Sequence, residues 1–212
     1  MSSAPSLETL IGASSVIPVL AVKRLGDAAP LARALAAGGL KVIELTLRTD
    51  VALDAMKAMQ DAAPDLLIGM GTVRTPEQAR ASAEAGAAFL VSPGLTAELG
   101  EAMLATGLAC LPGVATAGEA MAAQAQGFEV LKFFPAEPAG GIAYLKALEG
   151  PLPDIRFCPT GSISRERAPD YLALKNVVCV GGSWIATSAD IDAGNWAAIS
   201  ENARAAEAMK GR

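Results

Sequence analysis

Hydrophobic residues gather in short runs along the chain, and each run is followed by a longer, alanine-rich stretch with helical spacing. Short apolar runs are typical of strands buried on both faces, and amphipathic stretches are typical of helices. The pattern therefore predicts eight β-then-α units. The predicted strands occupy residues 16–22, 41–47, 66–72, 89–93, 108–114, 129–135, 156–162 and 177–182.

Eight alternating units favour an α/β fold, and specifically a small (β/α)8 TIM barrel in which right-handed crossovers join parallel strands. A doubly wound open sheet is the alternative, but it more often carries a nucleotide-binding fingerprint, which this sequence lacks. A further segment over roughly residues 5–14 predicts an extra N-terminal helix that covers the bottom of the barrel.

Proline and glycine indicate where the helices begin and end. Asp27 or Pro30 can open the helix after the first strand, and Pro76 with Glu77 opens another. Pro18 lies inside the first predicted strand, where the missing backbone donor predicts a bulge. The glycines expected at helix C-termini are Gly38, Gly86, Gly107 and Gly127.

The length and charge of the chain limit its organisation and its partners. With 212 residues, 52% of them hydrophobic, residues 1–212 are expected to form a single domain around one core. The net charge of -5 disfavours binding to nucleic acid or to an anionic membrane surface. The first basic residue is Lys23, and the apolar run 16–22 is too short for a signal peptide or a membrane span.

The sequence contains no histidine, so the commonest general base and metal ligand is absent. Acid–base chemistry must then fall to Glu, Asp, Lys or Tyr. The sequence also has no CxxC pair, P-loop or strand-linked GxGxxG, which disfavours a metal site and a dinucleotide cofactor. Reduced, buried thiols and a cytoplasmic location are expected from three cysteines in short apolar runs, Cys110, Cys158 and Cys179.

Two predicted strands each carry charge on the face expected to point into the barrel. Side chains alternate along a strand, so Val42, Glu44, Thr46 and Arg48 share one face, and the apolar residues between them face the helices. This arrangement places Arg48 at the C-terminal mouth, where barrel active sites lie. The same alternation directs Lys132 inward from the sixth strand.

An inward lysine is costly because its ammonium group loses water unless a partner replaces it. A partly solvated lysine or a structural ion pair would explain Lys132 without chemistry. The convergence of Glu44 and Arg48 on the same mouth instead favours a lysine that attacks a carbonyl group. Glu44 would then be the base, and Arg48 could clamp a carboxylate with two hydrogen bonds.

Glycine-containing turns end the last two predicted strands, at Thr160-Gly161-Ser162 and Gly181-Gly182-Ser183. Many barrels bind phosphate at this position through backbone amides, and glycine allows a close approach. Tight turns need glycine for their own reasons, so an ordinary turn and a phosphate site both remain open at this point.

The signatures ELTLRT at 44–49 and KFFPAE at 132–137 bring the base, the clamp and the lysine together, and they are far more specific than a barrel pattern. Through them the sequence resembles the bacterial KDPG aldolases, class I enzymes also called 2-dehydro-3-deoxy-6-phosphogluconate aldolases. The similarity runs from about residue 12 to 185. It includes VIPVLAVKRL, GMGTV, VSPGLT, LPGVAT, FCPTGSIS, DYLALKNV and VGGSW.

The resemblance implies a homotrimer that needs no cofactor or metal and acts on a phosphorylated keto acid in the Entner-Doudoroff pathway. Lys132 is implied to form a Schiff base and Glu44 to transfer protons while the substrate is cleaved to pyruvate and D-glyceraldehyde 3-phosphate. Arg48 and Thr72 would hold the pyruvyl carboxylate. The residues implied to shape the pocket are Pro93 and Phe134.

The implied phosphate site consists of Gly161, Ser162, Gly182 and Ser183. Ser162 departs from the family pattern, which usually has a second glycine there, and Thr160 resembles the gluconate-type enzymes. Alternative substrates are 4-hydroxy-2-oxoglutarate and the 6-phosphogalactonate epimer, since the pyruvyl half of the site is common to all of them. A barrel that binds a phosphate ligand without turnover is the alternative of a different class.

Overall fold

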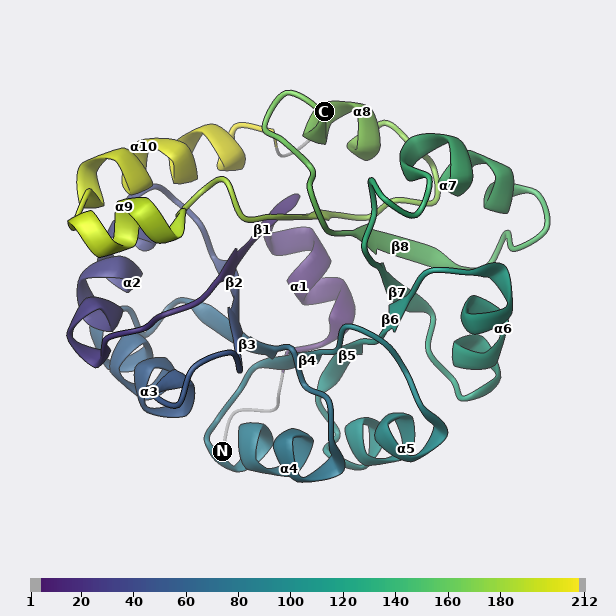
Figure 1. Ribbon diagram of the computed structural model, residues 1–212, viewed down its shortest axis with the longest axis horizontal. Coiled ribbons are helices and arrows are strands. Elements are labelled where there is room, and N and C mark those ends of the chain that lie inside the picture. The colour runs from purple at the N-terminus through teal and green to yellow at the C-terminus, as the bar shows by residue number, and fades with distance from the viewer. Residues whose placement is uncertain (1–4, 210–212) are drawn as a thin grey trace.

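Parallel strands lie at the centre of the structure, and helices surround them (Figure 1). The computed structural model describes residues 5–209. Every one of the eight predicted runs contains a strand. The strands are β1 (Val16–Leu20), β2 (Val42–Thr46), β3 (Leu67–Gly71), β4 (Phe89–Val91), β5 (Ala109–Leu111), β6 (Gly113–Val114), β7 (Val130–Phe133), β8 (Arg156–Pro159) and β9 (Val180–Gly182).

The strands pair in two parallel sheets, one with the order β5-β4-β3-β2-β1-β9 and one with the order β6-β7-β8. The fold is therefore α/β, as the alternating pattern predicted. The fifth predicted run is divided at Pro112 into β5 and β6, which pair with different sheets. Isolated parallel bridges also connect Phe157 with Val177 and Thr160 with Gly181.

The helices are α1 (Leu7–Ala13), α2 (Ala28–Ala37), α3 (Ala52–Ala62), α4 (Pro76–Glu84), α5 (Ala97–Ala105), α6 (Ala117–Ala125), α7 (Gly141–Glu149), α8 (Ala168–Leu172), α9 (Ser188–Ala193) and α10 (Trp196–Glu207), with a 3-10 turn at Leu25–Asp27. Asp27 is the N-cap of α2 and Pro76 is the first residue of α4, as predicted. Within residues 5–209, every helix is too short or too polar to cross a lipid bilayer.

Hydrogen bonds at the helix ends explain several of these boundaries. The side chains of Thr75, Thr96 and Thr116 each accept a backbone N–H at the start of a helix. Three of the four predicted C-terminal glycines, Gly86, Gly107 and Gly127, have a positive φ. At the end of α2 the positive φ of 96° belongs to Gly39, whereas Gly38 is the helical C-cap with a φ of −77°.

Apolar side chains form two clusters that follow the strand alternation. Ile43 and Leu131 belong to the larger cluster, which includes residues of the surrounding helices. Val42 and Val130, on the opposite faces of the same strands, belong to a smaller cluster that also contains Leu10 of α1. Figure 1 shows α1 among the strands, consistent with the place of Leu10 in this cluster.

The predicted bulge at Pro18 is wrong. β1 pairs with β9 in unbroken register from Val16 to Pro18, with one residue opposite each partner. Pairing of β1 with β2 begins only at Val19, one residue after the proline. The missing donor therefore falls where the second ladder has not yet started, and the strand accommodates it without an extra residue.

The three cysteines are free and buried, as the apolar runs around them predicted. Burial raises the pKa of the Cys110 thiol to about 12. A hydrogen bond with Cys158 and complete burial also raise the pKa of Cys179. These two thiols are therefore held in the protonated form, which is a poor nucleophile.

We expect iodoacetamide at about pH 8 to leave all three cysteines of the native protein unmodified, because the reagent needs an accessible thiolate. The same treatment in guanidinium chloride is expected to alkylate all three. Mass spectrometry of the intact protein measures both results. Rapid native labelling of Cys110 would contradict this account of its burial.

Candidate active site

Two buried ionisable side chains face each other across the interior. Lys132 on β7 is 5% exposed and Glu44 on β2 is 4% exposed. Lys132 Nζ donates to Glu44 Oε1 at 3.0 Å and to Oε2 at 3.3 Å. Because β2 and β7 belong to different sheets, this ion pair joins the two sheets across the interior. The predicted convergence of Lys132 and Glu44 is thus present.

The surroundings of Lys132 are apolar as well as acidic. The ring centroid of Phe134 lies 5.5 Å from Nζ, a distance at which an ammonium group is attracted to an aromatic face. Val130, the preceding inward-facing residue of β7, is fully buried in the smaller apolar cluster. Lys132 is therefore an amine with little water around it, held beside one carboxylate.

Gly71 makes room for the Glu44 carboxyl group. It ends β3 directly beside Thr46 in the β2–β3 register, and a Cβ at this position would overlap the carboxyl group of Glu44. Sequence reasoning missed this residue. The signal was a glycine at an inward position of a strand, which often marks the close approach of another group.

Arg48 lies beyond the end of β2, on the face that carries Glu44. Its Nε donates to Thr46 Oγ1 at 2.9 Å. Within residues 5–209, no carboxylate lies within ion-pair distance of Arg48. The guanidinium group is therefore a positive charge that no carboxylate of the described residues neutralises.

Arg48 lies between two adjoining cavities of about 140 and 330 Å³, which share Val19, Arg48 and Ser183. The larger one extends toward Trp184 and Thr187. The smaller one brings six predicted site residues together. These six are Arg48, Phe134, Thr160, Gly161, Ser162 and Ser183.

Of the two adjacent glycines of β9, Gly181 lines the smaller cavity, whereas the predicted Gly182 does not. Gly181 pairs with Thr160, and a Cβ on Gly181 would overlap the Thr160 side chain. A Cβ on Gly182 would instead lie 2.9 Å from Nε1 of Trp184. The absence of a side chain at Gly182 therefore leaves room for the indole ring of Trp184 beside the turn.

The turn after β8 has an unusual backbone. Gly161 has a φ of 114°, and Ser162 has a φ of 59°, in the left-handed region that side chains other than glycine disfavour. Ser162 therefore adopts a backbone conformation that is suited to glycine.

Thr72 directly follows β3 and Pro93 lies two residues after the end of β4, but neither residue lines the two cavities. Thr72 has a φ of 60°, which is strained for a β-branched residue. Pro93 packs closely against Gly113, where a Cβ would overlap the proline carbonyl. Both residues lie at the C-terminal ends of strands, on the same side as Arg48.

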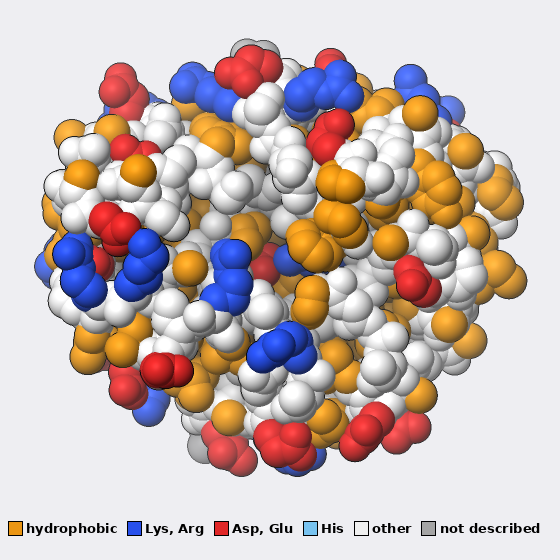
Figure 2. All heavy atoms as spheres, in the orientation of Figure 1, with side chains coloured by type: hydrophobic (Ala, Val, Ile, Leu, Met, Phe, Trp, Pro, Cys, Tyr) orange, Lys and Arg blue, Asp and Glu red, His pale blue; other side chains and the backbone are white. Residues whose placement is uncertain are grey.

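The molecular face in Figure 2, viewed as in Figure 1, is hollowed near its centre, with basic and acidic side chains visible in the hollow. Further basic side chains lie to the left of the hollow and below it in this view. Residues 5–209 contain no group of three or more Cys, Asp or Glu side chains arranged to hold a metal ion.

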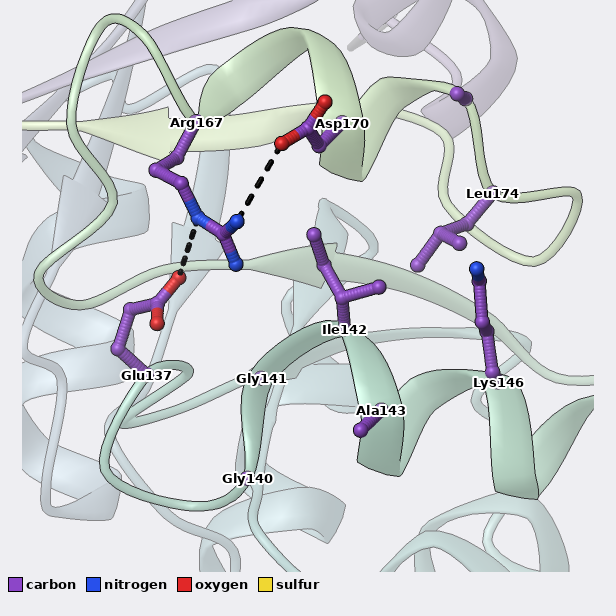
Figure 3. Close-up of a pocket in the computed structure, with 10 residues that line it drawn as sticks. Glu137, Gly140, Gly141, Ile142, Ala143, Lys146, Arg167, Asp170 and Leu174 are labelled. Carbon is purple, nitrogen blue, oxygen red and sulfur yellow. Dashed lines mark hydrogen bonds and ion pairs between the residues drawn. The ribbon is translucent and has the colours of Figure 1, made fainter.

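A larger cavity, of about 760 Å³, lies between α7 and α8 (Figure 3). Arg167 lies in it with both of its acidic neighbours, at 3.7 Å from Glu137 and 3.4 Å from Asp170. Glu137 also accepts a hydrogen bond from Tyr171. Glu137, Arg167 and Asp170 thus form one ion-paired group, and Lys146, which also lines this cavity, is exposed, so the cavity lacks a buried amine like Lys132.

Comparison with known proteins agrees with this arrangement. A sequence model of the KDPG and KHG aldolase family matches residues 7–202. The KHG/KDPG aldolase of Escherichia coli (strain K12) is 44% identical over 206 residues, which are 97% of this chain and 96% of that protein. The 2-dehydro-3-deoxy-phosphogluconate aldolase of Pseudomonas aeruginosa is 46% identical over 200 residues, covering 94% and 91%.

A solved structure is also similar. It is the KDPG aldolase of Legionella pneumophila with pyruvate captured at low pH as a covalent carbinolamine intermediate. It matches with a TM-score of 0.91 and 47% identity, over 94% of this chain and 97% of the other. Since the family match covers most of the chain and the relatives match over nearly their whole length, this chain belongs to the KDPG and KHG aldolase family.

Proposed function

We propose that this chain is a class I aldolase, a carbon–carbon lyase that cleaves 2-dehydro-3-deoxy-6-phosphogluconate to pyruvate and D-glyceraldehyde 3-phosphate. The observation that carries the proposal is the buried Lys132 amine, 3.0 Å from Glu44. A lysine nucleophile needs a group that takes its proton and a pocket with little water, and both are present. The covalent pyruvate adduct of the Legionella pneumophila relative supports the same chemistry.

The first step is formation of the Schiff base. Lys132 Nζ attacks the C2 carbonyl carbon while Glu44 accepts a proton from the nitrogen. The C2 oxygen, protonated to a hydroxyl and then to water, leaves to give a protonated imine. The imine is an electron sink next to C3, so the bond between C3 and C4 can break.

The second step is cleavage. Glu44, directly or through one water molecule, accepts the proton of the C4 hydroxyl group. The electrons of the C3–C4 bond move to the imine, which releases the aldehyde and leaves an enamine of pyruvate. Glu44 then returns a proton to C3, and hydrolysis of the new imine frees pyruvate and Lys132. Positioned protein groups perform each of these steps, so the proposal requires no metal or organic cofactor.

Arg48 and Thr72 are proposed to hold the carboxylate of the pyruvyl half, with Pro93 and Phe134 as walls of the pocket. The unneutralised guanidinium of Arg48 supports this role, because its terminal nitrogens can donate two parallel hydrogen bonds. The ring of Phe134, 5.5 Å from Lys132 Nζ, supports a position beside the reacting carbon.

The phosphate group is proposed to bind at the turns after β8 and β9. The left-handed backbone of Gly161 and Ser162 supports this assignment, because such turns can direct successive N–H groups toward an anion. The hydroxyl groups of Ser162 and Ser183 line the same cavity as Arg48 and Thr160. The proposed phosphate residues remain Gly161, Ser162, Gly182 and Ser183.

The proposal includes a closed (β/α)8 barrel, formed by residues 1–212 as one domain, with α1 covering one end. The bridges Phe157–Val177 and Thr160–Gly181 support closure between β8 and β9. At the other junction between the two sheets, only Pro112 separates β5 of the six-stranded sheet from β6 of the three-stranded sheet. The packing of Leu10 in the smaller apolar cluster supports the position of α1 over one end of the barrel.

We further place the protein in the cytoplasm as a homotrimer in the Entner-Doudoroff pathway of carbohydrate metabolism. The three free, buried cysteines support a reducing compartment. Exposed apolar side chains such as Met121 and Leu104 provide surface that contact between subunits would bury.

Trapping with borohydride tests the role of the lysine. Reduction in the presence of pyruvate is expected to add one reduced pyruvyl group to Lys132, detected by peptide mass spectrometry. Lys132→Ala should lose both the label and nearly all turnover. Lys146→Ala, which changes an exposed lysine, should keep both. An active wild-type protein that carries no label on Lys132 would refute the mechanism.

Gly71→Ala tests the requirement for room beside Glu44. The new methyl group should displace the carboxyl group from Lys132 and lower kcat by about 100-fold or more, as expected when an acid–base group is misplaced. Gly118→Ala is the matched control, since a Cβ there meets no atom within 4 Å. A Gly71→Ala enzyme with wild-type kcat would show that Glu44 does not need this position.

The phosphate assignment predicts a substrate preference. The value of kcat/KM for the phosphorylated keto acid should exceed that for its unphosphorylated counterpart by at least about 100-fold, because the unphosphorylated substrate would lack the charge-assisted hydrogen bonds to the two turns. A lactate-dehydrogenase-coupled assay measures pyruvate release from each substrate. The 6-phosphogalactonate epimer and 4-hydroxy-2-oxoglutarate should be poorer substrates. Equal rates with and without phosphate would count against the assignment of the two turns.

A further inference from the structure

A short chain of hydrogen bonds connects Arg48 to the backbone of β1 through Thr46. Thr46 is the last residue of β2 and is 1% exposed. Its Oγ1 accepts a hydrogen bond from Arg48 Nε at 2.9 Å. The same oxygen donates to the carbonyl oxygen of Leu20 at 2.7 Å. Leu20 ends β1, so the chain of bonds crosses from one strand to its neighbour.

The direction of each bond in this chain is determined by chemistry. A threonine hydroxyl has one hydrogen, and a carbonyl oxygen can only accept, so the hydrogen must point to Leu20. A lone pair of Oγ1 is then left for Arg48, whose Nε can only donate. The rigid β2 backbone and the β-branched side chain limit the rotation of Thr46. The Nε edge of the guanidinium group is consequently held in one orientation.

This orientation matters because Arg48 is otherwise free. Its two terminal nitrogens make no hydrogen bond to the described residues, and no carboxylate among those residues pairs with it. A long, exposed arginine side chain without other partners would adopt many rotamers. With Nε held, the two terminal nitrogens remain available as a fork for a carboxylate.

We propose that Thr46 is a positioning residue for carboxylate recognition, which fixes the Nε edge of Arg48 so that its terminal nitrogens meet the carboxylate of the pyruvyl group. The inference rests on the proposed function. It assigns a role to a residue that does not line either cavity beside Arg48 and has no reacting atom.

Thr49 provides a matched control. Its Oγ1 donates to the carbonyl oxygen of Val22 at 2.6 Å, so it also connects the end of β2 to the segment after β1. Its hydroxyl group has no hydrogen bond with Arg48. Replacing either threonine by valine removes one hydrogen bond to the β1 segment with little change in shape, but only the change at Thr46 releases the arginine.

The experiment compares trapping of pyruvate with trapping of acetone, a ketone that has no carboxylate. Borohydride inactivation is measured against ketone concentration for the wild type, Thr46→Val, Thr46→Ser and Thr49→Val. We expect Thr46→Val to raise the half-saturating pyruvate concentration about tenfold, as for loss of one charge-assisted contact. The half-saturating acetone concentration of Thr46→Val should stay within about twofold of the wild-type value. Thr46→Ser, which keeps the hydroxyl group, should recover most of the pyruvate affinity.

The controls separate this inference from stability and from the proposed function. Both valine variants should lower Tm by a similar amount, but Thr49→Val should keep the wild-type preference for pyruvate over acetone. An unchanged preference in Thr46→Val, or an equal loss in both valine variants, would overturn the role of Thr46. If the wild type forms no adduct with pyruvate, the proposed function fails and this inference fails with it.

Discussion

The buried contact between Lys132 and Glu44 is the interaction on which the rest of the site depends. Its two strands are not neighbours and lie in different sheets, so the fold must hold them at the 3.0 Å separation. Removal of one partner would leave a charge in a nearly dry interior, at a cost of about 3–5 kcal/mol. The glycine at position 71 meets the same constraint, since Glu44 occupies the space of its missing side chain.

Strained backbone occurs next to this pair, at the ends of strands. Thr72 after β3 and Ser162 after β8 are the two non-glycine residues with positive φ in the described chain. Each left-handed non-glycine residue lowers the stability of the folded state by about 1 kcal/mol or more. A loop without another role could avoid this cost through substitution of the residue by glycine. The surrounding sheets therefore hold Thr72 and Ser162 in conformations that place groups at the C-terminal ends of the strands, although these conformations lower stability.

Much of the fold and part of the site followed from the sequence, because strands buried on both faces leave a clear apolar signal and alternation assigns each side chain to a face. The alternation placed Glu44 and Lys132 on the inner face, where they pair. The alternation could not reveal which residues make room for a neighbouring side chain, so Gly71 and Gly181 were missed. The break at Pro112 and the regular strand at Pro18 depend on which neighbour each strand pairs with, and this is information that a local pattern lacks.

The two sheets bring different parts of the proposed site. The six-stranded sheet carries Glu44 and leads to Arg48, whereas the three-stranded sheet carries Lys132 and leads to the turn at 160–162. The bridge from Thr160 to Gly181 crosses the seam between them beside that turn. A phosphate bound between the two turns would contact both sides of this seam. Because binding energy from a non-reacting group can support geometry at the reacting centre, the phosphate would help to maintain the distance between the amine and the carboxylate.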